Sequence, residues 1–218
     1  MRRIVITGMG IISPVGNSVP VFWDNLKAGV CGVDLIRSFD TSDLSVKVAA
    51  QVKDFNPSDH GIDVPTARKA DLYTQYAMAA AHQAMKESNP EIDPERLGVY
   101  VGSGIGGIHT FIAECKKYFE NGANRVSPLF IPTMISNIAA GNIAIAYNAQ
   151  GPCLPVVTAC ATSTHAIGEA FLAIRHGYAD GIIAGGSEAA IVPLAVGGFN
   201  NSRALSRAED PQRASIPF

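Results

Sequence analysis

The chain has 218 residues, which is enough for one large domain with a sizeable core. Because 47% of the residues are hydrophobic and only 17% are charged, the composition excludes a disordered chain and favours a well-buried α/β protein. The net charge of −2 argues against bulk binding to nucleic acid or another polyanion.

The cysteine pattern and the absence of long apolar runs indicate the cellular compartment. The four cysteines have no C-x-x-C spacing and are Cys31, Cys115, Cys153 and Cys160. We therefore expect reduced thiols in the cytoplasm, without a disulfide framework or a zinc site. No apolar run reaches the length of a membrane span, and the short one over residues 3–7 predicts a first strand and not a leader.

Short apolar runs alternate with amphipathic or Ala-rich stretches along the chain. Strands are predicted over residues 3–7, 46–52, 97–102, 153–159 and 181–186. Helices are predicted over residues 21–27, 66–89, 107–122, 131–149 and 161–176, with a loop or short helix over 193–203. This alternation predicts a mostly parallel sheet with helices on both faces. Pro155 cannot donate to a ladder, so strand pairing in its segment must begin beyond it or leave its position free. Residues 202–218 lack periodicity, so we expect the front part of a longer chain.

Cys160 is the candidate nucleophile. It stands where a β-branched strand meets an Ala-rich helix, and the unpaired N–H groups at a helix start favour a thiolate. Its neighbours Ala159, Ala161 and Ser163 are small and leave room for a substrate. The alternative is a small buried hydrophobic residue, which is the more common role of a Cys among alanines.

A cysteine nucleophile needs an acid or base partner, usually histidine. His165 lies five residues further on the same predicted helix and is not expected to face the sulfur. The remaining histidines have no context that marks a base and are His60, His82, His109 and His176. The residues alone therefore predict a nucleophile without its partner.

Two glycine-rich stretches follow predicted strands. Gly102, Gly104 and Gly107 match the spacing G-x-G-x-x-G of a dinucleotide site, but no acidic residue ends a strand about 20 residues later. A tight turn that lets backbones pack closely is the favoured interpretation. The stretch 185–188, Gly-Gly-Ser-Glu, fits either a small active-site loop or a strand that ends in a turn.

The segment Val-Val-Thr-Ala-Cys-Ala-Thr-Ser-Thr-His over 156–165 closely resembles the nucleophile motif of β-ketoacyl-acyl carrier protein synthases, condensing enzymes of the thiolase-like fold. Other matching stretches run in the same order and cover residues 4–17, 68–71, 102–107, 127–132, 184–188 and 197–199. Ser-Gly-Ile-Gly-Gly together with Ser-Pro-Leu-Phe-Ile-Pro resembles the synthase II branch. The resemblance implies that residues 1–218 form the N-terminal thiolase-like domain of such an enzyme, incomplete at its end and without the C-terminal half.

The resemblance also implies a reaction in fatty acid biosynthesis. Cys160 would carry an acyl chain as a thioester, and malonyl-carrier protein would decarboxylate and attack it, without a metal or organic cofactor. The backbone N–H of Cys160 would form half of an oxyanion hole. Ile105 would be the gate of the acyl pocket, Phe199 a wall of it, and Phe130 the residue that a homodimer partner inserts.

Basic positions around the acyl carrier protein dock match Arg68, Lys69, Arg125 and Arg203. An acidic carrier protein would suit such a surface, although most surface basic residues are merely solvated. In this family the two catalytic histidines, the lysine and the second oxyanion donor lie in the second half, so we expect the 218 residues alone to be inactive. The alternatives are a non-catalytic module that binds acyl groups or carrier protein and, less favoured, a nucleotide-binding oxidoreductase domain.

Overall fold

The computed structural model describes residues 3–216, which form two compact units. The first, here called the sheet unit, combines the chain up to residue 10 with residues 56–189. The second unit combines residues 11–55 with the chain from residue 190 onward. Each unit has its own hydrophobic core.

The sheet unit contains one parallel pair of strands, β3 (Leu97–Gly102) and β4 (Gly181–Gly186). Its helices are α2 (Val64–Ala67), α3 (Leu72–Ser88), α4 (Ile108–Asn121), α5 (Phe130–Met134), α6 (Ile138–Ala146) and α7 (Thr162–Arg175). The strand register pairs Leu97 with Gly181 and continues to Gly102 with Gly186. Both strands were predicted with these bounds, and the parallel pairing is confirmed.

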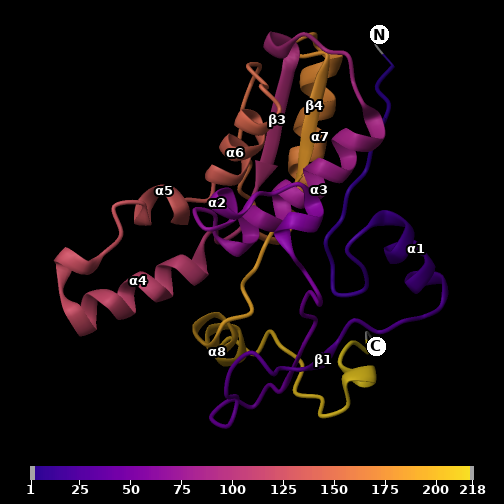
Figure 1. The fold of residues 1–218 in the computed structure, drawn as a ribbon. Coiled ribbons are helices and arrows are strands. Elements are labelled where there is room, and N and C mark those ends of the chain that lie inside the picture. Colours follow the sequence, from indigo (N-terminus) through magenta and orange to yellow (C-terminus); the bar gives the residue numbers. More distant parts are fainter. Residues whose placement is uncertain (1–2, 217–218) are drawn as a thin grey trace. The chain divides into compact units, whose positions relative to one another are not determined.

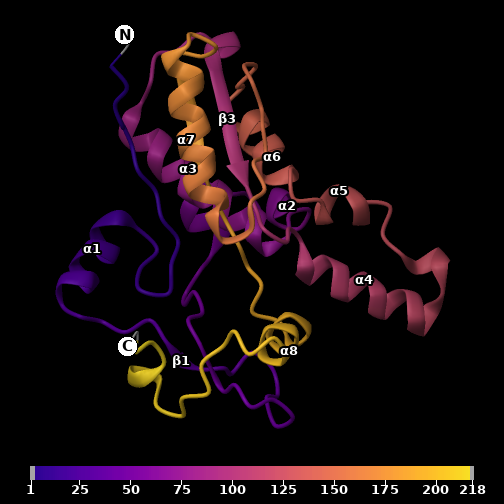
Figure 2. The ribbon, with the colours of Figure 1, turned by 180° about the vertical axis from the view of Figure 1, so that it is seen from behind.

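Successive side chains of β3 point to opposite faces of the sheet, as strand geometry requires. Val99 and Val101 join the core formed with α3 and α6 (Figure 1). Tyr100 joins the core formed with α7, which covers the other face (Figure 2). Every residue of β3 is buried. The prediction of helices on both faces is therefore confirmed in this unit.

The predicted strand over 153–159 is wrong in its extent. Its only pairing to β3, among the described residues, is a single parallel bridge between Val99 and Cys153. The Val99 N–H donates to Pro152 at 2.9 Å, and the Leu154 N–H donates to Val99 at 3.0 Å. The bridge precedes Pro155, and no strand resumes beyond it, because Pro155 offers no N–H to continue the ladder.

The predicted first strand over 3–7 is also wrong. Residues 3–10 are extended but form no ladder, and Ile6 is 80% exposed. The segment instead lies against α3: the Met9 N–H donates to Glu87 at 2.7 Å. A Cβ added at Gly10 would lie only 1.8 Å from the Ala80 carbonyl oxygen, so glycine is needed for this close approach.

Two predicted helices are each divided in the structure. The helix predicted over 66–89 consists of α2 and α3, which are separated at Asp71, the N-cap residue of α3. The helix predicted over 131–149 consists of α5 and α6, because Ile135 is extended with a ψ of 141°. The helices predicted over 107–122 and 161–176 are confirmed as α4 and α7.

The second unit is small. It contains α1 (Val19–Lys27), α8 (Pro193–Asn201) and the short antiparallel pair β1 (Asp34–Leu35) and β2 (Val48–Ala49). Its core is formed by Ile36, Val46 and Val196. The helix predicted over 21–27 is confirmed as α1, whereas the strand predicted over 46–52 is reduced to the two residues of β2. Residues 193–201, left open between loop and helix, form α8.

Candidate active site around Cys160

Cys160 lies in a sharp turn that leads directly into α7. Residues 159–161 form one turn of 3-10 helix, and the α-helix begins at Thr162. The Ala161 N–H donates to the Thr158 carbonyl at 3.1 Å, and the Thr158 N–H donates to the Thr162 hydroxyl at 2.9 Å. We call residues 158–162 the nucleophile turn. Because Cys160 is exposed, the alternative of a buried hydrophobic residue is wrong.

The nucleophile turn has a strained backbone. Ala159 has a φ of 51°, in the left-handed region that non-glycine residues seldom occupy. Such strain is concentrated at functional sites, where the surrounding structure holds it in place. In this turn it occurs at the residue directly before the exposed Cys160, close to the start of α7.

His165 makes a hydrogen bond within the nucleophile turn. Its Nδ1 lies 2.8 Å from the Thr158 hydroxyl. Among residues 3–216, no histidine makes a hydrogen bond to Cys160. Elsewhere, the His176 ring lies edge-on to Tyr178 with the centroids 6.4 Å apart. Among the described residues, the candidate nucleophile Cys160 therefore has no histidine bonded to it.

A second turn lies beside the nucleophile turn. We call residues 103–107, between β3 and α4, the glycine-rich turn. A Cβ added at Gly104 would lie 3.6 Å from the Ala159 Cα, and one added at Gly102 would lie 1.9 Å from the Val156 carbonyl oxygen. The close packing confirms the interpretation of this motif as a tight turn, and the dinucleotide site has no support.

Two carboxylates hold the glycine-rich turn and the helix that follows it. The Glu188 carboxylate accepts hydrogen bonds from the Ser103 hydroxyl and the Ile105 N–H, both at 3.1 Å. Asp71 is buried and accepts from the N–H and hydroxyl of Thr110 in the first turn of α4, both at 2.7 Å. Sequence analysis assigned neither role. An acidic residue just after a predicted strand was the available signal for Glu188, but its partner is 85 residues away.

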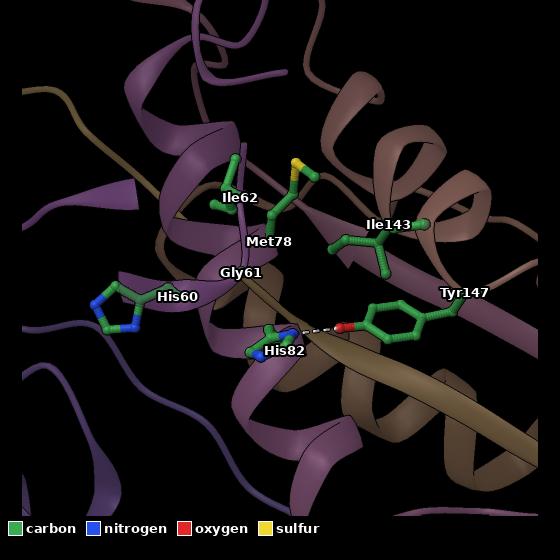
Figure 3. A pocket seen from close by; sticks show the side chains of 8 residues that line it. His60, Gly61, Ile62, Met78, His82, Ile143 and Tyr147 are labelled. Atoms are coloured by element: carbon green, nitrogen blue, oxygen red, sulfur yellow. Dashed lines mark hydrogen bonds between the residues drawn. The ribbon is translucent and has the colours of Figure 1, made fainter. Parts of the chain in front are cut away.

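A small pocket lies elsewhere in the sheet unit (Figure 3). Its lining residues are His60, Gly61, Ile62, Met78, His82, Ile143, Ala146 and Tyr147. His82 Nδ1 and the Tyr147 hydroxyl are 3.3 Å apart, and Figure 3 shows the His60 ring turned away from this pair. No predicted site residue lines the pocket. We therefore place the candidate active site at the nucleophile turn.

Comparison with known proteins identifies the family. The family model of the "Beta-ketoacyl synthase, N-terminal domain" matches residues 1–218. The chain belongs to this family. The family resemblance found in the sequence is therefore confirmed.

Among curated β-ketoacyl synthase relatives, the 3-oxoacyl-[acyl-carrier-protein] synthase 2 of Staphylococcus aureus (strain COL) is 46% identical, with 100% of this chain and 53% of the relative covered. The protein of the same name from Coxiella burnetii is 44% identical, with the same coverage. A crystal structure of a β-ketoacyl synthase from Burkholderia phymatum STM815 has a TM-score of 0.85 at 27% identity, covering 100% of this chain and 54% of that one. The fold is therefore thiolase-like, and the chain spans about half the length of the curated relatives it matches.

Three residues were expected at an acyl pocket. Ile105 lies in the glycine-rich turn beside the nucleophile turn, with its side chain 42% exposed. Phe130 begins α5 and packs near Phe111 of α4, with ring centroids 6.4 Å apart. Phe199 lies on α8 in the second unit. Their roles remain predictions.

The four expected docking residues are exposed but lie on different elements. Arg68 and Lys69 follow α2 directly, and the Lys69 carbonyl accepts a hydrogen bond from Thr133 of α5 at 3.3 Å. Arg125 lies in the turn after α4, and Arg203 belongs to the second unit. Only Arg68 and Lys69 are thus shown to be neighbours.

Within residues 3–216, no helix is long and apolar enough to cross a membrane.

Proposed function

We propose that the protein carrying this chain is a 3-oxoacyl-acyl carrier protein synthase of type II, which lengthens fatty acyl chains in the cytoplasm. The observation that carries the proposal is the exposed Cys160 in a strained turn at the start of α7. The 46% identity to proteins named 3-oxoacyl-[acyl-carrier-protein] synthase 2 supports the substrate class.

In the first proposed step, the Cys160 thiolate attacks the carbonyl carbon of an acyl thioester on the carrier protein. The new carbon–sulfur bond forms as the bond to the carrier's sulfur breaks, and the carrier leaves as a thiol after taking up a proton. The backbone N–H of Cys160, near the start of α7, would stabilise the oxyanion of the tetrahedral intermediate. The acyl chain is then held as a thioester.

In the second proposed step, malonyl-carrier protein loses carbon dioxide, and the resulting carbanion attacks the acyl-enzyme thioester. The Cys160 thiolate leaves, and the product is a β-ketoacyl chain two carbons longer. Because no histidine among residues 3–216 makes a hydrogen bond to Cys160, we assign the decarboxylation to groups outside them. The reaction so written uses neither a metal nor an organic cofactor.

Acyl carrier protein and a second copy of the protein are the proposed partners. Arg68 and Lys69 form an exposed basic pair, which suits an acidic carrier. Exposed apolar side chains gather on the arm of residues 108–134, which extends away from the sheet (Figure 1), and Phe119 there is 81% exposed. An apolar surface of this kind suits a homodimer, in which Phe130 would contact the partner's acyl pocket.

Acyl transfer tests the proposal directly. The protein is incubated with acyl-carrier protein, and its intact mass is measured. We expect a mass increase equal to one acyl group, located on Cys160 by peptide mapping and absent in Cys160→Ala. A protein that acquires no acyl group, or acquires it at another residue, would contradict the proposal.

A non-catalytic module of the same fold is the second candidate for residues 1–218. The absence of a base beside Cys160 within residues 3–216 favours it. Such a module would bind acyl-carrier protein without forming a thioester, so the two candidates differ in the intact mass after denaturation.

A further inference from the structure

Glu188 links the end of β4 to the glycine-rich turn. Its Oε1 accepts from the Ser103 hydroxyl and its Oε2 from the Ile105 N–H, both at 3.1 Å. The same Ser103 hydroxyl accepts a hydrogen bond from the Gly106 N–H at 3.0 Å, and Ser103 is almost fully buried. One carboxylate therefore holds the turn on both sides of Gly104.

The glycine-rich turn has little room in which to shift near this carboxylate. A Cβ added at Gly104 would lie 2.9 Å from Glu188 Oε2 and 3.6 Å from the Ala159 Cα. On its far side, the turn is fixed by the Gly107 N–H, which donates to Met134 at 2.8 Å. Glu188, the glycine-rich turn and the residue that precedes Cys160 thus form one continuous set of contacts.

Glu188 is an exposed residue, but desolvation and hydrogen bonding act on the pKa of its carboxylate in opposite directions. Desolvation raises the pKa of Glu188, and the hydrogen bonds from Ser103 and from backbone N–H groups only partly offset it. Within residues 3–216, no Lys or Arg forms an ion pair with Glu188. Hydrogen bonds from the turn, and not an ion pair, therefore hold this exposed glutamate in place.

We propose that Glu188 is a positioning residue that sets the acyl-chain selectivity of the Cys160 site. It fixes the Ile105 backbone in the turn that lies beside Ala159, the residue before Cys160, and Ile105 is the residue expected to gate the acyl pocket. This inference rests on the proposed function, in which acyl thioesters are the substrates. In that function, Glu188 would hold the expected gate residue, Ile105, in place.

The experiment measures acyl transfer to Cys160 in the full-length gene product. Carrier proteins loaded with short, medium and long acyl chains are compared by intact mass. In Glu188→Ala, we expect the ratio of long-chain to short-chain transfer rates to change by about tenfold, because small displacements near a reacting centre have large effects on rate. Alkylation of Cys160 by iodoacetamide, which needs no acyl pocket, should stay within about twofold of wild type, since the thiol itself is unaltered.

Companion variants separate positioning from general damage. Glu188→Gln retains one acceptor oxygen and should show a smaller change in the same ratio. Ser103→Ala should change it in the same direction, and the double variant should be less than additive because both residues act through one hydrogen-bond chain. Glu91→Ala, an exposed glutamate in the loop after α3, is the matched control and should match wild type.

The outcomes are separable. If the wild-type protein acquires no acyl group at all, the proposed function fails. If it is acylated but Glu188→Ala keeps the wild-type ratio, or loses all chain lengths and alkylation equally, the inference about Glu188 is overturned. Should the alanine variant not fold, Glu188→Gln and Ser103→Ala decide: a changed ratio supports the inference, and an unchanged ratio overturns it.

Discussion

At the scale of the single residue, the backbone of Ala159 is the most unusual feature of the site. Its φ of 51° costs an L-residue about 1–2 kcal/mol, whereas glycine adopts it freely. Glycine also lowers the free energy of unfolding by about 0.4–1 kcal/mol, because it gives the unfolded chain more conformational freedom. We therefore expect Ala159→Gly to raise the free energy of unfolding by between zero and about 1.6 kcal/mol, as measured by urea denaturation.

Ala161 offers a matched control two residues away. Its φ of −88° is an ordinary right-handed conformation at the N-cap of α7, so Ala161→Gly relieves no left-handed strain and should stabilise the protein less than Ala159→Gly does. Ala159→Val, with a β-branched side chain in the left-handed region, should be clearly destabilising. Equal effects of glycine at 159 and 161 would show that the strain at Ala159 is not significant.

The four cysteines should differ in reactivity. Cys160 is exposed at the start of α7, whereas Cys31 and Cys115 are half-buried. Cys153 has an exposed residue surface, but the atoms around its sulfur raise the pKa of its thiol, so it holds less thiolate at a given pH. In timed alkylation at neutral pH with peptide mass spectrometry, we expect Cys160 to react first. Faster labelling of Cys153 than of Cys160 would argue against the assignment of Cys160 as the nucleophile.

Sequence could single out Cys160 as the candidate nucleophile because its motif is local, with the strand-like segment, small residues and helix all within about 15 positions. Ile105 and Glu188 illustrate the limit. Their contact joins residues 83 positions apart, and no local pattern encodes such a pairing. The φ of Ala159 was equally out of reach, because it is imposed by packing and no sequence propensity predicts it.

At the scale of elements, glycines decide how closely neighbouring segments pack. A Cβ at Gly10 would clash with the α3 backbone at Ala80, whereas one at Gly168 of α7 would meet nothing within 4 Å. Gly10→Ala should therefore destabilise the protein by about 1–3 kcal/mol through overpacking. Gly168→Ala should stabilise it by up to about 1 kcal/mol through helix propensity. Thermal unfolding that moves in the same direction for both variants would contradict this.

The link between α4 and the turn after it should depend on pH. The Glu114 carboxylate pairs with Lys117 at 2.5 Å and accepts from the Ser127 N–H at 2.7 Å, and these contacts lower its pKa below the ordinary 4.5. A lowered pKa gives stability that is present above the ordinary value and lost as the pH falls through the folded value. Glu114→Gln should therefore reduce hydrogen-exchange protection of the Ser127 amide at neutral pH, with the difference shrinking in acid.

Glu120 is the control for Glu114 within the same helix. It forms only an exposed ion pair with Lys116 at 3.9 Å, and such pairs contribute little. Glu120→Gln should leave the protection of Ser127 unchanged at every pH. A loss equal to that of Glu114→Gln would mean that helix charge, and not the specific pairing, holds the turn.

Helices α4 and α7 and strands β3 and β4 were predictable because periodicity and flanking glycines mark them clearly. The predictions of secondary structure that were wrong share a cause, which is contact with segments distant in the sequence. Residues 3–7 have the composition of a buried strand but find no partner in the described chain, and they pack on α3 through Gly8 and Gly10. The long predicted helices were divided at Asp71 and Ile135, where contacts with other segments outweigh helix propensity.

At the scale of the whole molecule, exposed apolar surface predicts association. On the arm, Phe119 is 81% exposed and packs edge-on against Tyr118, and Ile131 is 54% exposed. We expect the purified chain to sediment above its monomer mass, and Phe119→Ser to reduce that association. Tyr178→Ser, which removes an exposed ring outside the arm, should not. A monomer at all concentrations would contradict the prediction.

The pairing of β3 with β4 also has a consequence for synthesis on the ribosome. The strands are adjacent in the sheet, yet residues 103–180 lie between them in the chain. At about 5–20 residues per second, a completed β3 waits about 4–16 seconds before β4 exists. During that interval a strand whose residues all become buried has no partner. Nascent chains stalled in this interval should therefore be the ones that chaperones bind most strongly.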